Sequence, residues 1–133
     1  MLLSSHEVII GMKRIFYYTD VLPFLSKEQA AIDKLIRNLD LFNHYADEIT
    51  LVWHPWSKTV EYLQLNNSPV INDYLNLIEE YRRNGWGILD ESVTLNDTRD
   101  VMLSCNAYYG DMCDLIYDAQ DAGIPVMIQN TDI

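Results

Sequence analysis

The stretch NAYYGDMCDLIYDAQDAGIPVMIQN, residues 106–130, decides the fold of this chain. Residues 107–109 favour a strand, Gly110 permits a tight turn, and Asp111 can act as the N-cap of a helix. Apolar residues then recur at helical spacing, and residues 125–129 favour a second strand. A strand, a helix and a second strand form a parallel crossover, the unit with which α/β proteins hold a phosphate at a helix N-terminus.

The segments before this crossover alternate in the same way. Further strands are predicted at residues 13–21, 48–55 and 86–91, and further helices at residues 26–47, 68–85 and 96–104. The first of these helices opens on a capping-box pattern, Ser26 with Gln29, and the second on Ser68 and Pro69 as N-cap and first helical residue. The sequence leaves open whether the polar loop at residues 56–67 holds a short helical turn.

This order of elements predicts an α/β fold. We expect one Rossmann-like, doubly wound domain with a mostly parallel sheet of about five strands and ligands at the carboxyl ends of those strands. Residues 1–12 are predicted to form a leader segment and residues 13–133 the domain. A chain of 133 residues that is 49% hydrophobic is long enough to bury one such core.

Charge and composition exclude several classes of partner. The chain carries 20 acidic and 9 basic side chains, and its net charge of -11 should repel nucleic acid and anionic membranes. The N-terminus lacks the basic start of a signal peptide, and no apolar run reaches the roughly 18 residues of a transmembrane helix. Cys105 and Cys113 show no zinc-type pairing and suit a reducing compartment. We therefore expect a cytoplasmic protein without a transmembrane segment.

Polar residues follow each predicted strand, and the parallel arrangement should bring them to one edge of the sheet. They are Thr19 and Asp20, His54, Asp90 and Glu91, Gly110 and Asp111, and Gln129 and Asn130. His54 is the candidate catalytic residue, because a histidine at a strand end can donate a proton or bind a phosphate oxygen. The alternative is that His54 caps its strand beside Trp53 and Trp56.

The glycine turn supplies the candidate nucleotide- and phosphate-binding residues. They are Gly110, Asp111, Met112, Cys113 and Asp114, together with Asp90 and Glu91. Acidic side chains at a helix N-terminus favour the helix dipole, so Asp111 and Asp114 can simply stabilise the helix. They could also hold a divalent cation that bridges to phosphate. No metal-ligand spacing supports that cation elsewhere, so no resident metal or cofactor is predicted.

Three segments carry a resemblance to a known family: residues 51–56 (LVWHPW), 72–92 (NDYLNLIEEYRRNGWGILDES) and 106–130. They resemble the C-terminal half of bacterial CDP-glycerol glycerophosphotransferase-like proteins and related polysaccharide-assembly proteins, which have the GT-B glycosyltransferase architecture. A weaker similarity at residues 13–25 extends the match over residues 13–133. The resemblance implies one half of a GT-B fold that holds a CDP- or UDP-linked donor, in a two-domain transferase of teichoic-acid-type polymer synthesis.

The chain departs from that family at two places. Relatives commonly read Trp-Arg-Pro-His-Pro after the second strand, where this chain has Trp53, His54, Pro55, Trp56 and Ser57. Relatives also place a serine pair after the Gly-Asp turn, where this chain has Cys113 and Asp114. A carboxylate about 4 Å from a diphosphate costs on the order of a few kcal/mol in a partly solvated site, so the donor site is predicted to be impaired.

Two functional hypotheses follow. In the first, the chain is a nucleotide-binding transferase domain that requires a GT-B-like N-terminal domain from another polypeptide or a longer parent, and lies at the inner face of the membrane through that partner. In the second, it is a single-domain binding or interaction protein without transferase activity, and its uncovered apolar surface drives homo-oligomerisation. A flavodoxin-like receiver is a further alternative, but the first strand lacks the acidic cluster or phosphate loop of such domains.

Overall fold

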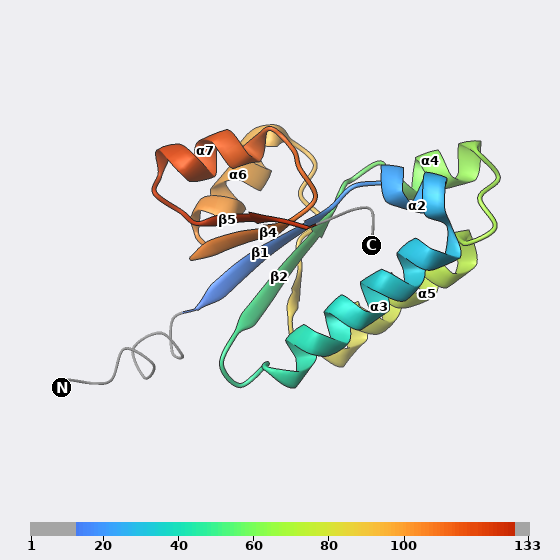
Figure 1. The fold of residues 1–133 in the computed structure, drawn as a ribbon, viewed down its shortest axis with the longest axis horizontal. Coiled ribbons are helices and arrows are strands. Elements are labelled where there is room, and N and C mark those ends of the chain that lie inside the picture. Colours follow the sequence, from blue (N-terminus) through green and yellow to red (C-terminus); the bar gives the residue numbers. More distant parts are fainter. Residues whose placement is uncertain (1–12, 130–133) are drawn as a thin grey trace.

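One parallel sheet organises residues 13–129, which are the residues that this computed structural model describes. Its five strands lie in the order β3-β2-β1-β4-β5, and every neighbouring pair is parallel. Helices cover both faces of the sheet (Figure 1). The predicted Rossmann-like α/β domain is thus confirmed, and the sheet is parallel throughout.

The strands are β1 (Arg14–Thr19), β2 (Thr50–Pro55), β3 (Ile88–Leu89), β4 (Ala107–Gly110) and β5 (Val126–Ile128). The helices are α2 (Leu22–Lys27), α3 (Gln29–His44), α4 (Thr59–Leu65), α5 (Ile71–Asn84), α6 (Leu95–Leu103) and α7 (Leu115–Asp121). The predicted leader segment, residues 1–12, lies outside the described residues.

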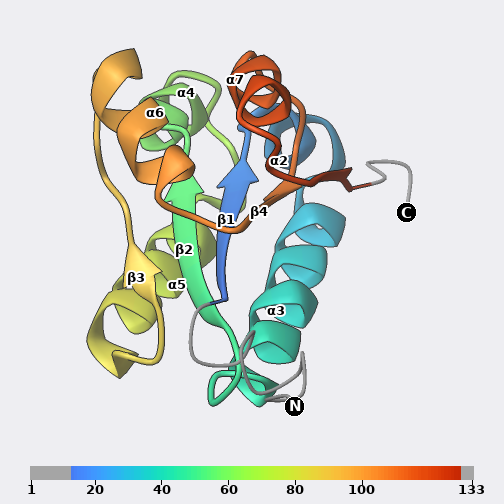
Figure 2. The same cartoon turned by 90° about the vertical axis from the view of Figure 1, so that its left-hand side faces the viewer.

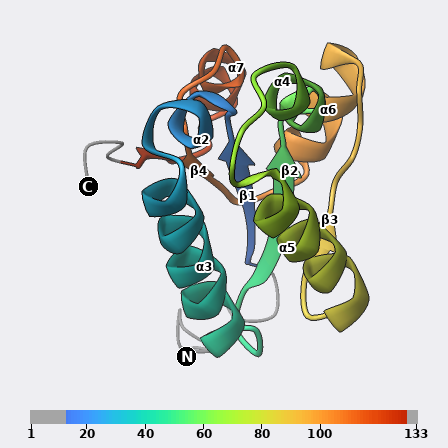
Figure 3. The same ribbon diagram turned by 90° about the vertical axis from the view of Figure 1, so that its right-hand side faces the viewer.

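Side chains of β1 point alternately into two hydrophobic clusters, one on each face of the sheet. Tyr17 packs with Trp53 of β2 under α2, α3 and α5, which stand in front of the sheet in Figure 3. Phe16 and Tyr18 point to the opposite face, where α6 and α7 cover them (Figure 2). Strands buried on both faces are typical of parallel sheets and explain the nearly continuous apolar runs of β1 and β2.

The first helical segment is broken in two, and the predicted capping box is wrong. Glu28 adopts φ 47 and ψ -113, which interrupts the helix between Lys27 and Gln29. Ser26 lies inside α2, where its hydroxyl donates to the carbonyl of Leu22 at 3.0 Å. A non-glycine residue at positive φ is uncommon, and no sequence rule for helix starts anticipates it.

Other boundaries also differ from the predictions. Helix α5 begins at Ile71 instead of Pro69, because the Ser68 hydroxyl accepts the N–H of Val70 at 3.3 Å in a turn that precedes the helix. Its predicted end is confirmed, since Gly85 has φ 69 and terminates the helix in the left-handed conformation. The open question about residues 56–67 is answered by α4, which occupies most of that loop.

Gly110 is the position where the sheet tolerates no side chain. It has φ 133, and a Cβ built on it would lie 2.1 Å from the carbonyl oxygen of Tyr18 in β1. We expect Gly110→Ala to lower the free energy of unfolding by at least ~2 kcal/mol, through backbone strain and a forced separation of β1 and β4. Urea titration followed by tryptophan fluorescence measures this change.

Gly123 is the matched control for that substitution. It also has positive φ (75), but a Cβ there would meet nothing within 4 Å. Gly123→Ala should therefore lower the free energy of unfolding by only ~1–2 kcal/mol, the cost of placing a residue with a Cβ in the left-handed conformation. Equal losses in the two variants would contradict the close approach of β1 and β4.

Candidate functional site

The strand order places the switch point of the fold between β1 and β4. From β1 the chain adds β2 and β3 on one side of the sheet and β4 and β5 on the other. Open α/β sheets leave a crevice at the carboxyl ends of the strands at such a point, and their ligands bind there. The residues that follow β1 and β4 are therefore the first to consider.

Asp111, which follows β4, ties three strand ends together. Its carboxylate accepts the backbone N–H of Asp20 at 2.7 Å and the side-chain amide of Gln129 at 2.6 Å. Its own N–H donates to the carbonyl of Tyr18 at 2.9 Å. The side-chain carbonyl oxygen of Gln129 accepts a hydrogen bond from the side-chain amide of Asn38 in α3 at 3.1 Å. A continuous polar chain thus runs from α3 across the ends of β5, β4 and β1.

This arrangement corrects the predicted role of Asp111 as the N-cap of α7. The helix begins at Leu115, and Asp114 occupies the N-cap position without a side-chain cap bond in the described chain. The Asp111 side chain is only 4% exposed. Burial raises its pKa, and the bonds from Asp20 and Gln129 and the positive charge of Lys34 partly offset that rise.

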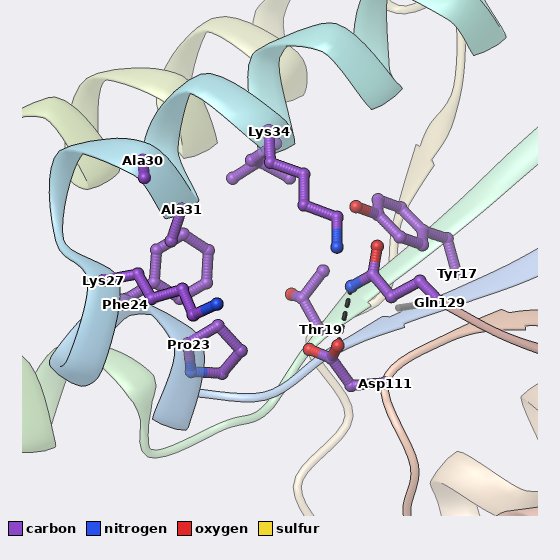
Figure 4. Close-up of a pocket in the computed structure, with 11 residues that line it drawn as sticks. Tyr17, Thr19, Pro23, Phe24, Lys27, Ala30, Ala31, Lys34, Asp111 and Gln129 are labelled. Atoms are coloured by element: carbon purple, nitrogen blue, oxygen red, sulfur yellow. Dashed lines mark hydrogen bonds between the residues drawn. The ribbon is translucent and has the colours of Figure 1, made fainter. Parts of the chain in front are cut away.

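A cavity of about 150 Å³ opens beside Asp111 on the face covered by α2 and α3. Thr19, Asp111 and Gln129 form its strand side, with the Thr19 hydroxyl held by the Trp53 indole N–H at 3.0 Å. The helix side includes Lys27 and Lys34, and both ammonium groups point into the cavity (Figure 4).

Sequence reasoning missed both lysines. Lys27 is the last residue of α2, and Lys34 lies in the second turn of α3. The break at Glu28 separates α2 from α3, and the side chains of both lysines reach one cavity. The available signal was weak: two of nine basic residues stand seven positions apart, just after the first strand.

The predicted phosphate turn makes a smaller contribution to this cavity. The described residues that line it include Asp111 but none of Met112, Cys113 and Asp114. Met112 and Asp114 are exposed, whereas Cys113 is half-buried with its sulfur 3.3 Å from the Tyr108 hydroxyl. Burial raises the pKa of the Cys113 thiol, which keeps the sulfur protonated and poorly nucleophilic.

The exposure of Asp114 bears on the predicted impairment of the donor site. Water screens a charge at such a position, so its repulsion of a diphosphate about 4 Å away is nearer ~1 kcal/mol than several. A diphosphate at that position would therefore lose affinity only several-fold because of Asp114. Whether the site is impaired stays a prediction.

His54 forms a second polar group at the end of β2. Its Nδ1 lies 2.9 Å from the Asp90 carboxylate, which also accepts the Ser92 hydroxyl at 2.8 Å. The ring is 4% exposed and stacks on Phe16 and Tyr18. A carboxylate at Nδ1 holds the ring proton there and leaves Nε2 as the acceptor, as in a general base.

Burial is the main influence on the His54 ring. It lowers the pKa, and the charge and hydrogen bonds of Asp90 offset part of that shift. The ring lies on the α6 and α7 face, whereas the lysine cavity lies under α2 and α3. The two polar groups were expected at one edge of the sheet. Both follow the ends of strands, but they lie on opposite faces of the sheet. Trp53, the predicted neighbour of His54, points to the cavity side.

The remaining predicted residues lie apart from the cavity. Glu91 is exposed and pairs with Arg82 of α5 at 2.7 Å. Asn130 lies outside the described residues. Within residues 13–129, no group of three histidine, cysteine or acidic side chains is arranged to hold a metal ion. None of the helices within residues 13–129 has the length and hydropathy of a membrane-spanning segment.

Comparison with known proteins gives no relative. No protein-family model, curated protein or solved structure matches the chain. The function must therefore be argued from the site itself.

The His54–Asp90 pair predicts that the stability of the fold depends on pH. The folded pKa of His54 should lie below 6.5, so the folded ring is neutral where the unfolded ring takes up a proton. The stability that His54 contributes is then fully present above pH 6.5 and is lost as the pH falls toward the lowered folded value. Replacement of Asp90 by Asn should lower the folded pKa further, because the carboxylate favours the charged ring. Titration of the His54 ring protons by NMR measures both values.

Glu91→Gln is the matched control, since it removes an adjacent exposed carboxylate that pairs with Arg82 instead of His54. It should leave the titration unchanged. A folded pKa at or above 6.5, or one that rises in Asp90→Asn, would contradict this description of the pair.

Proposed function

We propose that this chain is the donor-nucleotide half of a two-domain transferase of the CDP-glycerol glycerophosphotransferase-like, GT-B class. It binds a CDP- or UDP-linked donor at the switch point and does not catalyse transfer without an N-terminal partner domain. The observation that carries the proposal is the cavity between the ends of β1 and β4, where Asp111, Gln129 and two lysine ammonium groups converge. The resemblance of residues 51–56, 72–92 and 106–130 to that family supports the same class.

The division of polar groups between two faces supports an incomplete active site. A ligand in the lysine cavity lies across the sheet from His54. A general base must come within about 3 Å of the proton that it removes. His54 is 4% exposed under α6 and α7 and does not reach a ligand in the lysine cavity, so in this proposal the general base for transfer comes from a second domain. The chain would function in the cytoplasm and reach the inner face of the membrane through this partner.

Titration calorimetry with CDP, CDP-glycerol and a UDP-sugar, with and without Mg²⁺, tests the proposal. We expect at least one nucleotide to bind with a dissociation constant on the order of 0.1–1 mM, because the isolated half contacts only part of the donor. If the diphosphate lies beside the start of α7, Asp114→Ala should tighten binding by about fivefold, which corresponds to ~1 kcal/mol of screened repulsion. If the diphosphate lies in the lysine cavity, the affinity should stay the same.

Asp121→Ala is the control, since it removes an acidic residue from the far end of the same helix. It should leave nucleotide affinity unchanged. Tight CDP binding that Asp114→Ala leaves unchanged would contradict the impaired site. Failure of every nucleotide would contradict the donor-binding function itself.

One observation favours the alternative, a non-catalytic interaction protein. An apolar groove of about 740 Å³ lies between the C-terminal half of α3 and strands β4 and β5, lined by residues that include Phe42, Tyr109 and Met127. Met127 is 66% exposed. A parallel sheet is normally covered on both faces, so this groove marks a surface that another polypeptide can cover.

Light scattering tests whether that surface drives self-association. If it does, the apparent mass should rise with concentration, and Met127→Asp should return the chain to monomer by placing a charge in the apolar contact. Leu65→Asp is the control, because Leu65 is similarly exposed (71%) but lies on α4. A strictly monomeric chain at its highest soluble concentration would count against the interaction alternative.

A further inference from the structure

We propose that the phosphate part of the ligand binds in the switch-point cavity between Lys27 and Lys34, and not at the start of α7. This inference rests on the proposed function, because it names the part of the donor that the cavity holds. It replaces the phosphate position expected from the glycine turn with one built by α2 and α3.

Charge is the first reason. The chain carries a net charge of -11, yet two of its nine basic side chains direct their ammonium groups into one small cavity (Figure 4). A lysine ammonium is a compact charge with three donors, which suits the oxygens of a phosphate. Lys34 and Asp111 line the same cavity, and the charge of Lys34 offsets part of the rise that burial causes in the pKa of Asp111.

The break at Glu28 is the second reason. It ends α2 at Lys27 and starts the 16-residue helix α3 against the cavity, which Ala30 and Ala31 of its first turn line. Among the described residues, no side chain forms a hydrogen-bonded cap at this N-terminus. The positive end of the α3 dipole therefore adds to the potential that the two lysines create.

The start of α7 offers a poorer place for an anion. The helix has seven residues, and the exposed carboxylate of Asp114 stands at its N-cap. By contrast, both carboxylate oxygens of Asp111 at the cavity accept hydrogen bonds, one from Asp20 and one from Gln129. Its charge is thus partly compensated before any ligand enters.

The size of the cavity decides which part of the ligand it holds. Sites for whole drug-sized ligands occupy roughly 300–1,000 Å³, whereas this cavity has about 150 Å³. It can take a phosphate or diphosphate group but not a complete nucleotide. The base and sugar must then extend out of the cavity, beyond the lysines.

Inorganic pyrophosphate is the probe that separates this inference from the proposed function. Calorimetry would compare pyrophosphate, CDP and cytidine on the full chain and on the variants Lys27→Gln and Lys34→Gln. We expect each substitution to lower the affinity for pyrophosphate and for CDP by about tenfold, because one charged hydrogen bond is lost. Lys58→Gln, at an exposed lysine of the α4 N-cap, should leave both affinities unchanged.

The outcomes distinguish the two claims. Lysine-dependent binding of pyrophosphate, with no added affinity for CDP, would support this inference and overturn the nucleotide function. Binding of CDP that neither lysine variant weakens would overturn this inference and leave the nucleotide function standing. Failure of both probes to bind would overturn both.

A measurement on the unsubstituted chain removes any dependence on the folding of a variant. Addition of pyrophosphate should shift the backbone amide NMR signals of Ala30 and Ala31 and leave those of Cys113 and Asp114 in place. The reverse pattern would place the anion at α7 and contradict the proposal.

Discussion

The Asp111 carboxylate is the interaction on which the rest of the site depends. It joins the end of β4 to the backbone of Asp20 after β1 and to the side chain of Gln129 after β5. Burial of an unpaired carboxylate costs several kcal/mol, so these two hydrogen bonds are what make the position tolerable. The close contact of Gly110 with Tyr18 brings the carboxylate within reach of its partners. Sheet geometry and site geometry are therefore set by the same two adjacent residues.

Side chains of α2 and α3 complete the polar cavity that the strand ends form. Asn38 of α3 holds both Gln129 and the Tyr17 hydroxyl at 3.1 Å, which fixes the helix against the edge of the sheet. With α3 fixed, Lys34 points into the cavity, and α2, which ends at the break at Glu28, brings Lys27 to the same cavity. The result is one cavity with positive groups on its helix side and a bonded carboxylate on its strand side. The His54–Asp90 pair stands on the opposite face of the sheet.

The fold could be predicted because its signals are local and repeated. Apolar runs such as those of β1 and β2, separated by amphipathic helices, specify a parallel sheet, and this inference does not require the strand order. The site could be predicted only in part. Asp111 was recognised, but the N-cap rule considers neighbours within a few residues, whereas its actual donor, the N–H of Asp20, is 91 positions away. The roles of Lys27 and Lys34 depend on one strained residue, Glu28, that no pattern marks.

A crystal structure of the chain grown with CDP tests the central claim most directly. The claim is that the switch-point cavity of this Rossmann-like domain holds the phosphate part of a nucleotide. It predicts electron density for the diphosphate between Lys27 and Lys34, with the cytidine directed out of the cavity. Density for the diphosphate at Cys113 and Asp114, with the lysine cavity unchanged, would contradict it.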